Sequence, residues 1–299
     1  MTGSGRPAQI EVFFNAVAGL GKAVAADLAT QLENAGVQAR VHAVPAAQLA
    51  QRIRSAARNA DVVGVSGGDG TQMTAAGVLA GHRATLAPIP TGTLNHFARR
   101  IGLSDVDDAA AAILAGRTEM VPVGIADDLV FLNTATFGLY ADVVRQREHL
   151  RPWLTKWPAA ALALAGRLIR MRRLQVILEV EGTKLKRLTP LVWVGVGWGS
   201  FPRVHQAAER REQPDLEIVV LRPRGRFGII PLGLRFLRHL RGRNRPVEDP
   251  ALEVIHARSL LIRSREPIGV TLDGEAMRLQ PPVFVGIVDN ALRVVGAAE

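Results

Sequence analysis

The chain has 299 residues, 48% of them apolar, no cysteine and a formal net charge of +10. This length and composition allow two domains with sizeable cores, and the lack of cysteine excludes disulfides, thiolate nucleophiles and cysteine zinc sites. The positive charge favours a polyanionic partner, either a nucleic acid, a nucleotide or an anionic membrane face. Most of the cations are arginine, because the only lysines are Lys22, Lys156, Lys184 and Lys186.

The N-terminal stretch "MTGSGRPAQIEVFF" lacks the basic, apolar and small-residue order of a signal peptide. No stretch approaches the roughly 20 uncharged apolar residues that a spanning helix needs. We therefore expect a cytoplasmic protein, with peripheral contact at the inner membrane face as an open alternative.

Strand-like and helix-like segments alternate over the first third of the chain. The expected strands are 10–15, 37–44, 61–66 and 84–90, and the expected helices are 21–36, 46–57, 70–81 and 94–102. Such alternation is typical of a parallel sheet that helices cover on both faces.

Short strands dominate after about Val121. Two helical inserts, 158–173 and 231–242, interrupt them. The pattern predicts an α/β plus β fold, in which a Rossmann-like parallel-sheet domain over 1–121 precedes an antiparallel β-sandwich domain over 122–285. The C-terminal tail, about 286–299, is a candidate to pack back on the first domain.

Three glycines surround Asp69 in "SGGDGT", where the strand 61–66 leads into a helix. Ligands of open parallel sheets bind at this end of the strands, and glycines let backbone N–H groups approach a phosphate next to a helix N-terminus. Asp69 would repel a bare phosphate, which suggests a ribose hydroxyl, a magnesium ion or a hydroxyl nucleophile as its partner. The alternative is a tight turn with Asp69 as the helix N-cap.

A second loop, "PTGTLN" at 90–95, follows the next expected strand with another glycine, two hydroxyls and an amide. Two loops on adjacent strands would face one crevice, which favours a nucleotide site over two unrelated turns. A third loop, "NAVAGLGKA" at 15–23, matches neither the dinucleotide pattern nor the P-loop, although Gly19 and Gly21 fit a phosphate-facing turn.

In this order the motifs resemble the diacylglycerol kinase catalytic domain family of bacterial soluble lipid kinases, which is related more distantly to sphingosine kinases and NAD kinase. The resemblance covers nearly the whole chain, through "NAVAG", "GGDGT", "PTGTLNHFAR", "FLNTATFGLYADVVRQRE" and "TLDGE". NAD kinase shares "GGDGT" alone, whereas the combination with "GTLNHFAR" and a late "LDGE" is specific to the lipid kinases.

The resemblance implies that ATP and Mg²⁺ bind the first domain and that the hydroxyl of a diacylglycerol-like or sphingoid-like membrane lipid is phosphorylated. The implied catalytic residues are Asp273, Glu275 and Asp69. The implied nucleotide-binding residues are Asn15, Gly19, Gly67, Gly68, Asp69, Gly70, Thr71, Gly92, Thr93 and Asn95. For "LDGE", the competing interpretation is a hairpin turn with Asp-Gly at its tip.

The chain departs from the family pattern in three places. Ala16 replaces the usual proline of the first loop. Gln213-Pro214 replace an Asp-Gly pair near a structural magnesium of some relatives, which leaves Asp215 as a weak metal candidate. The segment "GVGWGSFP" replaces an Asn-Asn-x-Tyr segment, so the acceptor pocket is expected to differ.

Several alternatives stay open. The segments 158–173 and 229–245 carry basic amphipathic patterns that fit either peripheral membrane contact or packing on the sandwich. A soluble NAD-kinase-like enzyme and a non-catalytic nucleotide- or lipid-binding sensor would keep the glycine loops. A homodimer is also open. Nucleic-acid binding ranks last, because the basic residues come without interleaved aromatics or a recognisable module.

Overall fold

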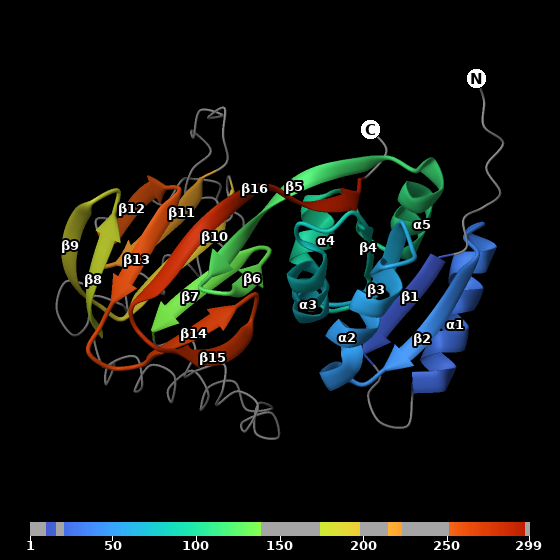
Figure 1. The fold of residues 1–299 in the computed structure, drawn as a ribbon, viewed down its shortest axis with the longest axis horizontal. Helices are drawn as coiled ribbons and strands as arrows, with labels where there is room; N and C mark the ends of the chain where they lie inside the picture. Colours follow the sequence, from blue (N-terminus) through green and yellow to red (C-terminus); the bar gives the residue numbers. More distant parts are fainter. Residues whose placement is uncertain (1–9, 16–20, 139–173, 198–214, 223–250, 297–299) are drawn as a thin grey trace, which may run out of the picture. The chain divides into compact units, whose positions relative to one another are not determined.

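The computed structural model describes residues 10–15, 21–138, 174–197, 215–222 and 251–296 (Figure 1). The chain divides into two compact units. The first unit is Met1–Val123, Leu129–Leu132 and Val288–Glu299, and the second is Gly124–Asp128 and Asn133–Ile287. The chain changes unit within β5 (Thr118–Ala126), on either side of the segment Leu129–Leu132, and within β16 (Val283–Val295).

The first unit contains a parallel sheet in the order β2-β1-β3-β4, with the last residues of β16 beside β4. Its strands are β1 (Ile10–Asn15), β2 (Ala39–Val44), β3 (Val62–Gly67) and β4 (Thr85–Pro90). Its helices are α1 (Gly21–Asn34), α2 (Ala46–Ala57), α3 (Asp69–Leu79), α4 (His96–Arg100) and α5 (Val106–Ala115).

Helices cover both faces of this sheet, as the alternating sequence pattern predicted. On one face, Leu28 and Leu32 of α1 and the alanines of α5 pack against Ile10 and Val12. On the other, Leu49 and Ile53 of α2 join the buried residues of α3 and Phe13. A four-residue spacing gives α2 one apolar stripe, so burial of that stripe stabilises the helix.

Helix α5 was not among the expected elements. Its N-cap is Asp105, whose side chain accepts a hydrogen bond from the Asp108 N–H at 2.9 Å, and Gly116 ends it in the left-handed conformation. Both are ordinary helix boundary signals in the sequence.

The sheet changes its direction of growth at β1. The chain places β2 on one side of β1 and then β3 on the other. The carboxyl ends of β1 and β3, which end at Asn15 and Gly67, therefore flank a topological switch point. Ligands of open α/β sheets bind at such points.

The second unit contains two antiparallel sheets. One has the order β12-β11-β10-β7-β14-β15, and the other joins the first residues of β16 to β13, β8 and β9. The strands of the first sheet are β7 (Thr134–Gly138), β10 (Leu191–Val196), β11 (Leu216–Leu221), β12 (Leu252–Ala257), β14 (Ile268–Leu272) and β15 (Glu275–Leu279). The strands of the second are β8 (Leu174–Val180), β9 (Thr183–Thr189) and β13 (Ser259–Arg263).

The two sheets are tied together by polar contacts. Arg187 of β9 donates two hydrogen bonds to the Glu253 carboxylate of β12, at 2.6 and 2.8 Å. These bonds raise the pKa of Arg187 and lower the pKa of Glu253. The Thr189 hydroxyl donates to the Leu221 carbonyl oxygen at 2.7 Å. The predicted fold class, a Rossmann-like domain followed by an antiparallel β-sandwich, is thereby confirmed.

Some strands differ from expectation. The stretch Thr118–Gly138 forms three strands, because β6 (Leu129–Phe131) separates β5 from β7, which begins at Thr134. The short strands β12 and β15 were not expected. The helical inserts at 158–173 and 231–242 lie outside the described residues.

Candidate active site

Two glycine loops lie side by side at the carboxyl edge of the parallel sheet. Strands β3 and β4 pair in parallel, with Ser66 opposite Ile89 and Gly67 opposite Pro90. The hydroxyls of Ser66 and Thr91 are 2.8 Å apart in a hydrogen bond between the loops. The expectation that both loops face the same edge is confirmed by this register.

The loops touch through two glycines. A Cβ built on Gly92 would lie 2.8 Å from the Gly68 nitrogen and closer still to its Cα. Real Cβ atoms do not approach backbone so closely, so only glycine fits at position 92 while the loops keep this spacing. The contact brings the N-terminus of α3 against the second loop.

Asp69 joins the same two loops with its side chain. It is the first residue of α3, and the N-cap position before it is Gly68, which has no side chain to cap the helix. The Asp69 Oδ1 accepts a hydrogen bond from the Phe97 N–H of α4 at 3.1 Å. The carboxylate therefore caps α4, whereas the N-cap of α3 is Gly68 and not Asp69, which differs from the alternative turn interpretation of this loop.

Asn95 closes the second loop. It adopts the left-handed conformation, with φ of 52°, and its amide both accepts from the Gly92 N–H at 3.0 Å and donates to the Gly92 carbonyl oxygen at 2.8 Å. Only 6% of Asn95 is exposed. Its side chain thus holds the loop closed, and its predicted contact with a nucleotide stays a prediction. The neighbouring Thr93 is exposed, and Leu94 is 58% exposed.

The other nucleotide-binding candidates that the structure describes lie at the same strand ends. Asn15 is the exposed last residue of β1. The Gly70 carbonyl oxygen accepts from the Thr74 hydroxyl, and the Thr71 N–H donates to the Gly68 carbonyl oxygen at 3.0 Å. Gly19 lies outside the described residues. Sequence reasoning missed Ser66 and Phe97, because their roles depend on contacts between loops.

The two late acidic candidates belong to the second unit. Asp273 and Gly274 form a two-residue turn between β14 and β15, with φ of 46° and 94°. The Asp273 Oδ1 accepts hydrogen bonds from the N–H groups of Asn133 and Thr134, each at 2.8 Å. Glu275 is exposed at the start of β15. The "LDGE" segment is thus a hairpin turn, and its aspartate is held against β7.

Metal ligands are sparse in the described part of the chain. No three histidine, aspartate or glutamate side chains there lie close enough together to hold an ion. Asp215 stands just before β11, where its carbonyl oxygen accepts from the Gly197 N–H. It stays an untested candidate.

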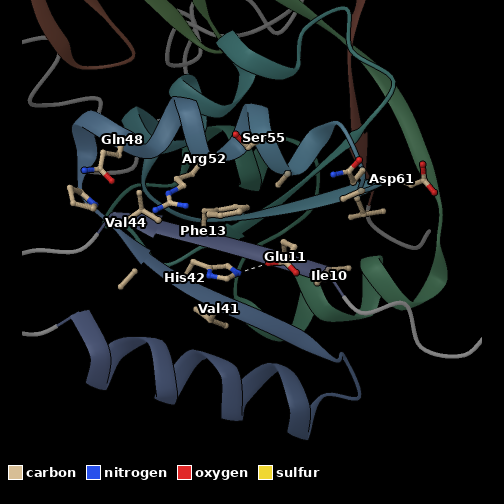
Figure 2. Close-up of a pocket in the computed structure, with 16 residues that line it drawn as sticks. Ile10, Glu11, Phe13, Val41, His42, Val44, Gln48, Arg52, Ser55 and Asp61 are labelled. Carbon is tan, nitrogen blue, oxygen red and sulfur yellow. Dashed lines mark hydrogen bonds and ion pairs between the residues drawn. The ribbon is translucent and has the colours of Figure 1, made fainter.

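A separate groove runs along the sheet between β2 and α2 (Figure 2). His42 stacks on Phe13 with ring centres 5.1 Å apart and bonds to Glu11, while Arg52 and Gln48 line the helix side. The groove shares no residue with the glycine loops, so it is not the nucleotide site expected from the sequence.

The comparisons with known proteins agree with this geometry. Residues 9–126 match the model of the diacylglycerol kinase catalytic domain. This part of the chain is therefore similar to the diacylglycerol kinase catalytic domain. A diacylglycerol kinase of Mycobacterium tuberculosis H37Rv is 34% identical over 134 residues, and one of Bacillus subtilis is 33% identical over 119 residues.

These alignments are partial. The M. tuberculosis match covers 43% of this chain and 43% of that protein, so the chain spans less than half the length of the curated relative it matches. A solved diacylglycerol kinase from Bacillus anthracis resembles 96% of the chain, with a TM-score of 0.66 and 20% identity, which supports the fold over both units. In the described residues, no helix is long and apolar enough to cross a membrane.

Proposed function

We propose that this chain is a lipid kinase that transfers the γ-phosphoryl group of ATP to a hydroxyl of a diacylglycerol-like or sphingoid-like membrane lipid. The observation that carries the proposal is the pair of glycine loops after β3 and β4, joined by Asp69 and by the contact of Gly68 with Gly92, the first of them beside the switch point of the sheet. The family match and the diacylglycerol kinase names of the relatives support a lipid acceptor.

Phosphoryl transfer requires mainly positioning and charge neutralisation. Backbone N–H groups at the glycine-rich N-terminus of α3 would bind the phosphates, helped by the positive end of the helix dipole. Thr93, exposed beside them, would contact the nucleotide. Asn15 would line the same end of the sheet from β1.

Mg²⁺ usually binds proteins through one or two carboxylates together with substrate phosphates and water. The Asp69 carboxylate beside the backbone donors fits that requirement, so this residue would hold the ion through its side chain. Bound there, Mg²⁺ would neutralise charge that develops on the phosphates.

Asp273 is the proposed base. The acceptor oxygen forms a bond to the γ-phosphorus, the bond from that phosphorus to the bridging oxygen breaks, and ADP leaves. The hydroxyl proton passes to the Asp273 carboxylate, which Asn133 and Thr134 hold in a fixed orientation. Glu275 assists from the other side of the turn.

The experiment is incubation of the protein with γ-labelled ATP, Mg²⁺ and three acceptors: vesicle-borne diacylglycerol, vesicle-borne sphingosine, and NAD. Label in either lipid, lost in Asp69→Asn, supports the proposal and names the acceptor class. Label in NAD alone would replace it with a soluble NAD-kinase-like enzyme. ATP binding without any labelled product would indicate a non-catalytic sensor.

A further inference from the structure

One face of the second unit's β16-β13-β8-β9 sheet carries apolar and cationic side chains together. Along each strand every second side chain points toward the core, and those of Val176, Leu178 and Ile262 are buried there. Their neighbours in sequence point the other way. We call these the outer face: Gln175, Ile177, Glu179, Lys184, Lys186, Leu188, Leu261, Arg263 and Phe284.

The register fixes which of these side chains are neighbours. One row across the sheet is Phe284, Leu261, Glu179 and Lys184. The next row joins Arg263, Ile177 and Lys186, and the row after that pairs Gln175 with Leu188. Apolar and basic residues therefore lie together on one continuous surface within the second unit.

The apolar part is unusual for this kind of sheet. An antiparallel sheet with one face toward water commonly has polar residues on that face. Here Leu188 is 55% exposed and Phe284 is 41% exposed, with Leu261 and Ile177 half-buried between them. Exposed apolar side chains gathered on one surface are typical of sites that bind a partner.

The charge indicates which partner fits. Lys184 and Lys186 are exposed, and they are two of only four lysines in the chain. Arg263 contacts Glu179 at 3.3 Å, so three cations stand against one carboxylate on this face. A surface with apolar side chains that can enter a bilayer and lysines that can reach its headgroups matches an anionic membrane.

Edge protection and self-association fit the face less well. Lysines on an edge strand such as β9 prevent pairing with other chains, but that role gives no reason for Leu188 and Phe284 to point outward. A second copy docked face to face would bring like charges together, which opposes association.

We propose that this outer face is a membrane-docking surface that binds anionic lipid headgroups. This inference goes beyond the proposed function, because a lipid kinase must reach its membrane substrate but could do so through a different part of its surface. Docking can be measured without ATP, so failure of the kinase proposal would leave this inference standing, and the reverse also holds.

The test is sedimentation of the full chain with sucrose-loaded vesicles, either of phosphatidylcholine alone or with a third of phosphatidylglycerol. Wild type should bind only the anionic vesicles, and binding should fall with added salt because exposed charges are screened. Lys184→Gln with Lys186→Gln should weaken the partition coefficient by about 10- to 30-fold, since each basic residue near such a surface contributes roughly one kcal/mol. Leu188→Ser should weaken it further with little change in salt dependence.

The matched control is Arg54→Gln with Arg58→Gln, which removes the same charge from exposed positions around α2 in the first unit. It should bind as wild type does. If the control lost as much vesicle binding as the lysine variant, net charge alone would explain the loss and the proposal would be overturned. Vesicle binding of the lysine variant equal to that of wild type would overturn it as well. Equilibrium ultracentrifugation covers self-association: a dimer that Leu188→Ser dissociates would assign the face to a second copy instead.

Discussion

The backbone N–H of Phe97 donates a hydrogen bond to the Asp69 Oδ1 at 3.1 Å, although the two residues are 28 positions apart. Asp69 is thus the first residue of α3, at the end of the first glycine loop, and its carboxylate caps α4, which follows the second glycine loop. A residue proposed to act on the nucleotide also sets the spacing of the loops. Its charge and its hydrogen-bond acceptor are therefore two separable properties.

Substitutions at Asp69 should separate them. Asp69→Asn keeps an oxygen for the Phe97 N–H, so its stability should stay within about 0.5 kcal/mol of wild type, as for most substitutions that keep their contacts. Asp69→Ala loses the cap and should cost about 1 kcal/mol. Both should lose phosphoryl transfer by at least about 10²-fold. Urea unfolding and initial rates measure the two effects, and wild-type turnover in Asp69→Asn would leave the loop as a turn only.

Gly92 provides a test of the loop contact. Gly92→Ala puts a methyl group against the Gly68 backbone, so the loops must separate, at a cost of about 1–3 kcal/mol. ATP affinity should fall as well, because the donors of the first loop would move. Thermal melting and titration with ATP would check both results.

Gly77→Ala is the matched control for Gly92. Gly77 is exposed on α3, and a Cβ there meets nothing within 4 Å. Because alanine favours helix, this variant should gain about 0.5–1 kcal/mol and bind ATP normally. If Gly92→Ala behaves like Gly77→Ala, the close approach of the loops has no role in binding.

Much of the first unit could be predicted because its signals are local. The four-residue spacing of Leu49 and Ile53 marks the buried stripe of α2, and each glycine loop directly follows a run of buried strand residues. Once a parallel sheet is inferred, strand ends must share an edge. The nearness of the two loops therefore follows from the pattern alone.

The contacts within the site could not be predicted in the same way. The Asp69 bond to Phe97 and the Ser66 bond to Thr91 depend on the exact spacing of the loops. Asn95 illustrates the same limit: its two hydrogen bonds to the Gly92 backbone depend on its left-handed conformation, which the sequence does not specify. Short strands such as β15 carry too few residues for a clear period.

The pair Arg187–Glu253 predicts a pH effect on stability. Arg187 lowers the pKa of Glu253 through its hydrogen bonds, and both side chains are about one-fifth exposed. Because the pKa of Glu253 is lower in the folded chain than in the unfolded chain, where it is near 4.3, the pair stabilises the fold at any pH above that unfolded-state pKa. This stabilisation is lost as the pH falls through the folded-state pKa of Glu253. Stability should therefore drop below about pH 4.

Glu253→Gln measures this contribution by urea unfolding at pH 7 and at pH 3. At pH 7 the variant should be about 1–3 kcal/mol less stable than wild type, and the difference should shrink at pH 3. Arg222→Gln is the control, because Arg222 is more exposed and its guanidinium lies 3.6 Å from the same carboxylate. It should cost less than about 0.5 kcal/mol. If the difference in the free energy of unfolding between Glu253→Gln and wild type were the same at pH 7 and pH 3, the ion pair would not be the source of the pH effect.

The last prediction concerns Asp273, whose Oδ1 is occupied by the Asn133 and Thr134 N–H groups. Asp273→Asn suits the positive φ of this turn, because Asn-Gly is a preferred two-residue hairpin loop, and it keeps an oxygen for both donors. It should fold normally and bind ATP with unchanged affinity. If the carboxylate takes the acceptor proton, kcat should fall by about 10²- to 10⁴-fold.

Two companion variants distinguish a base from a structural carboxylate. Asp273→Ala leaves both N–H groups without this acceptor, so it should lower the free energy of unfolding by about 1–3 kcal/mol and should also lower kcat. Glu275→Gln, at an exposed position in the next strand, should reduce the rate less than Asp273→Asn. Steady-state kinetics with ATP varied at fixed lipid would separate kcat from KM. Near-normal kcat in Asp273→Asn, or a loss of ATP affinity in proportion to rate, would transfer the role of base to Asp69.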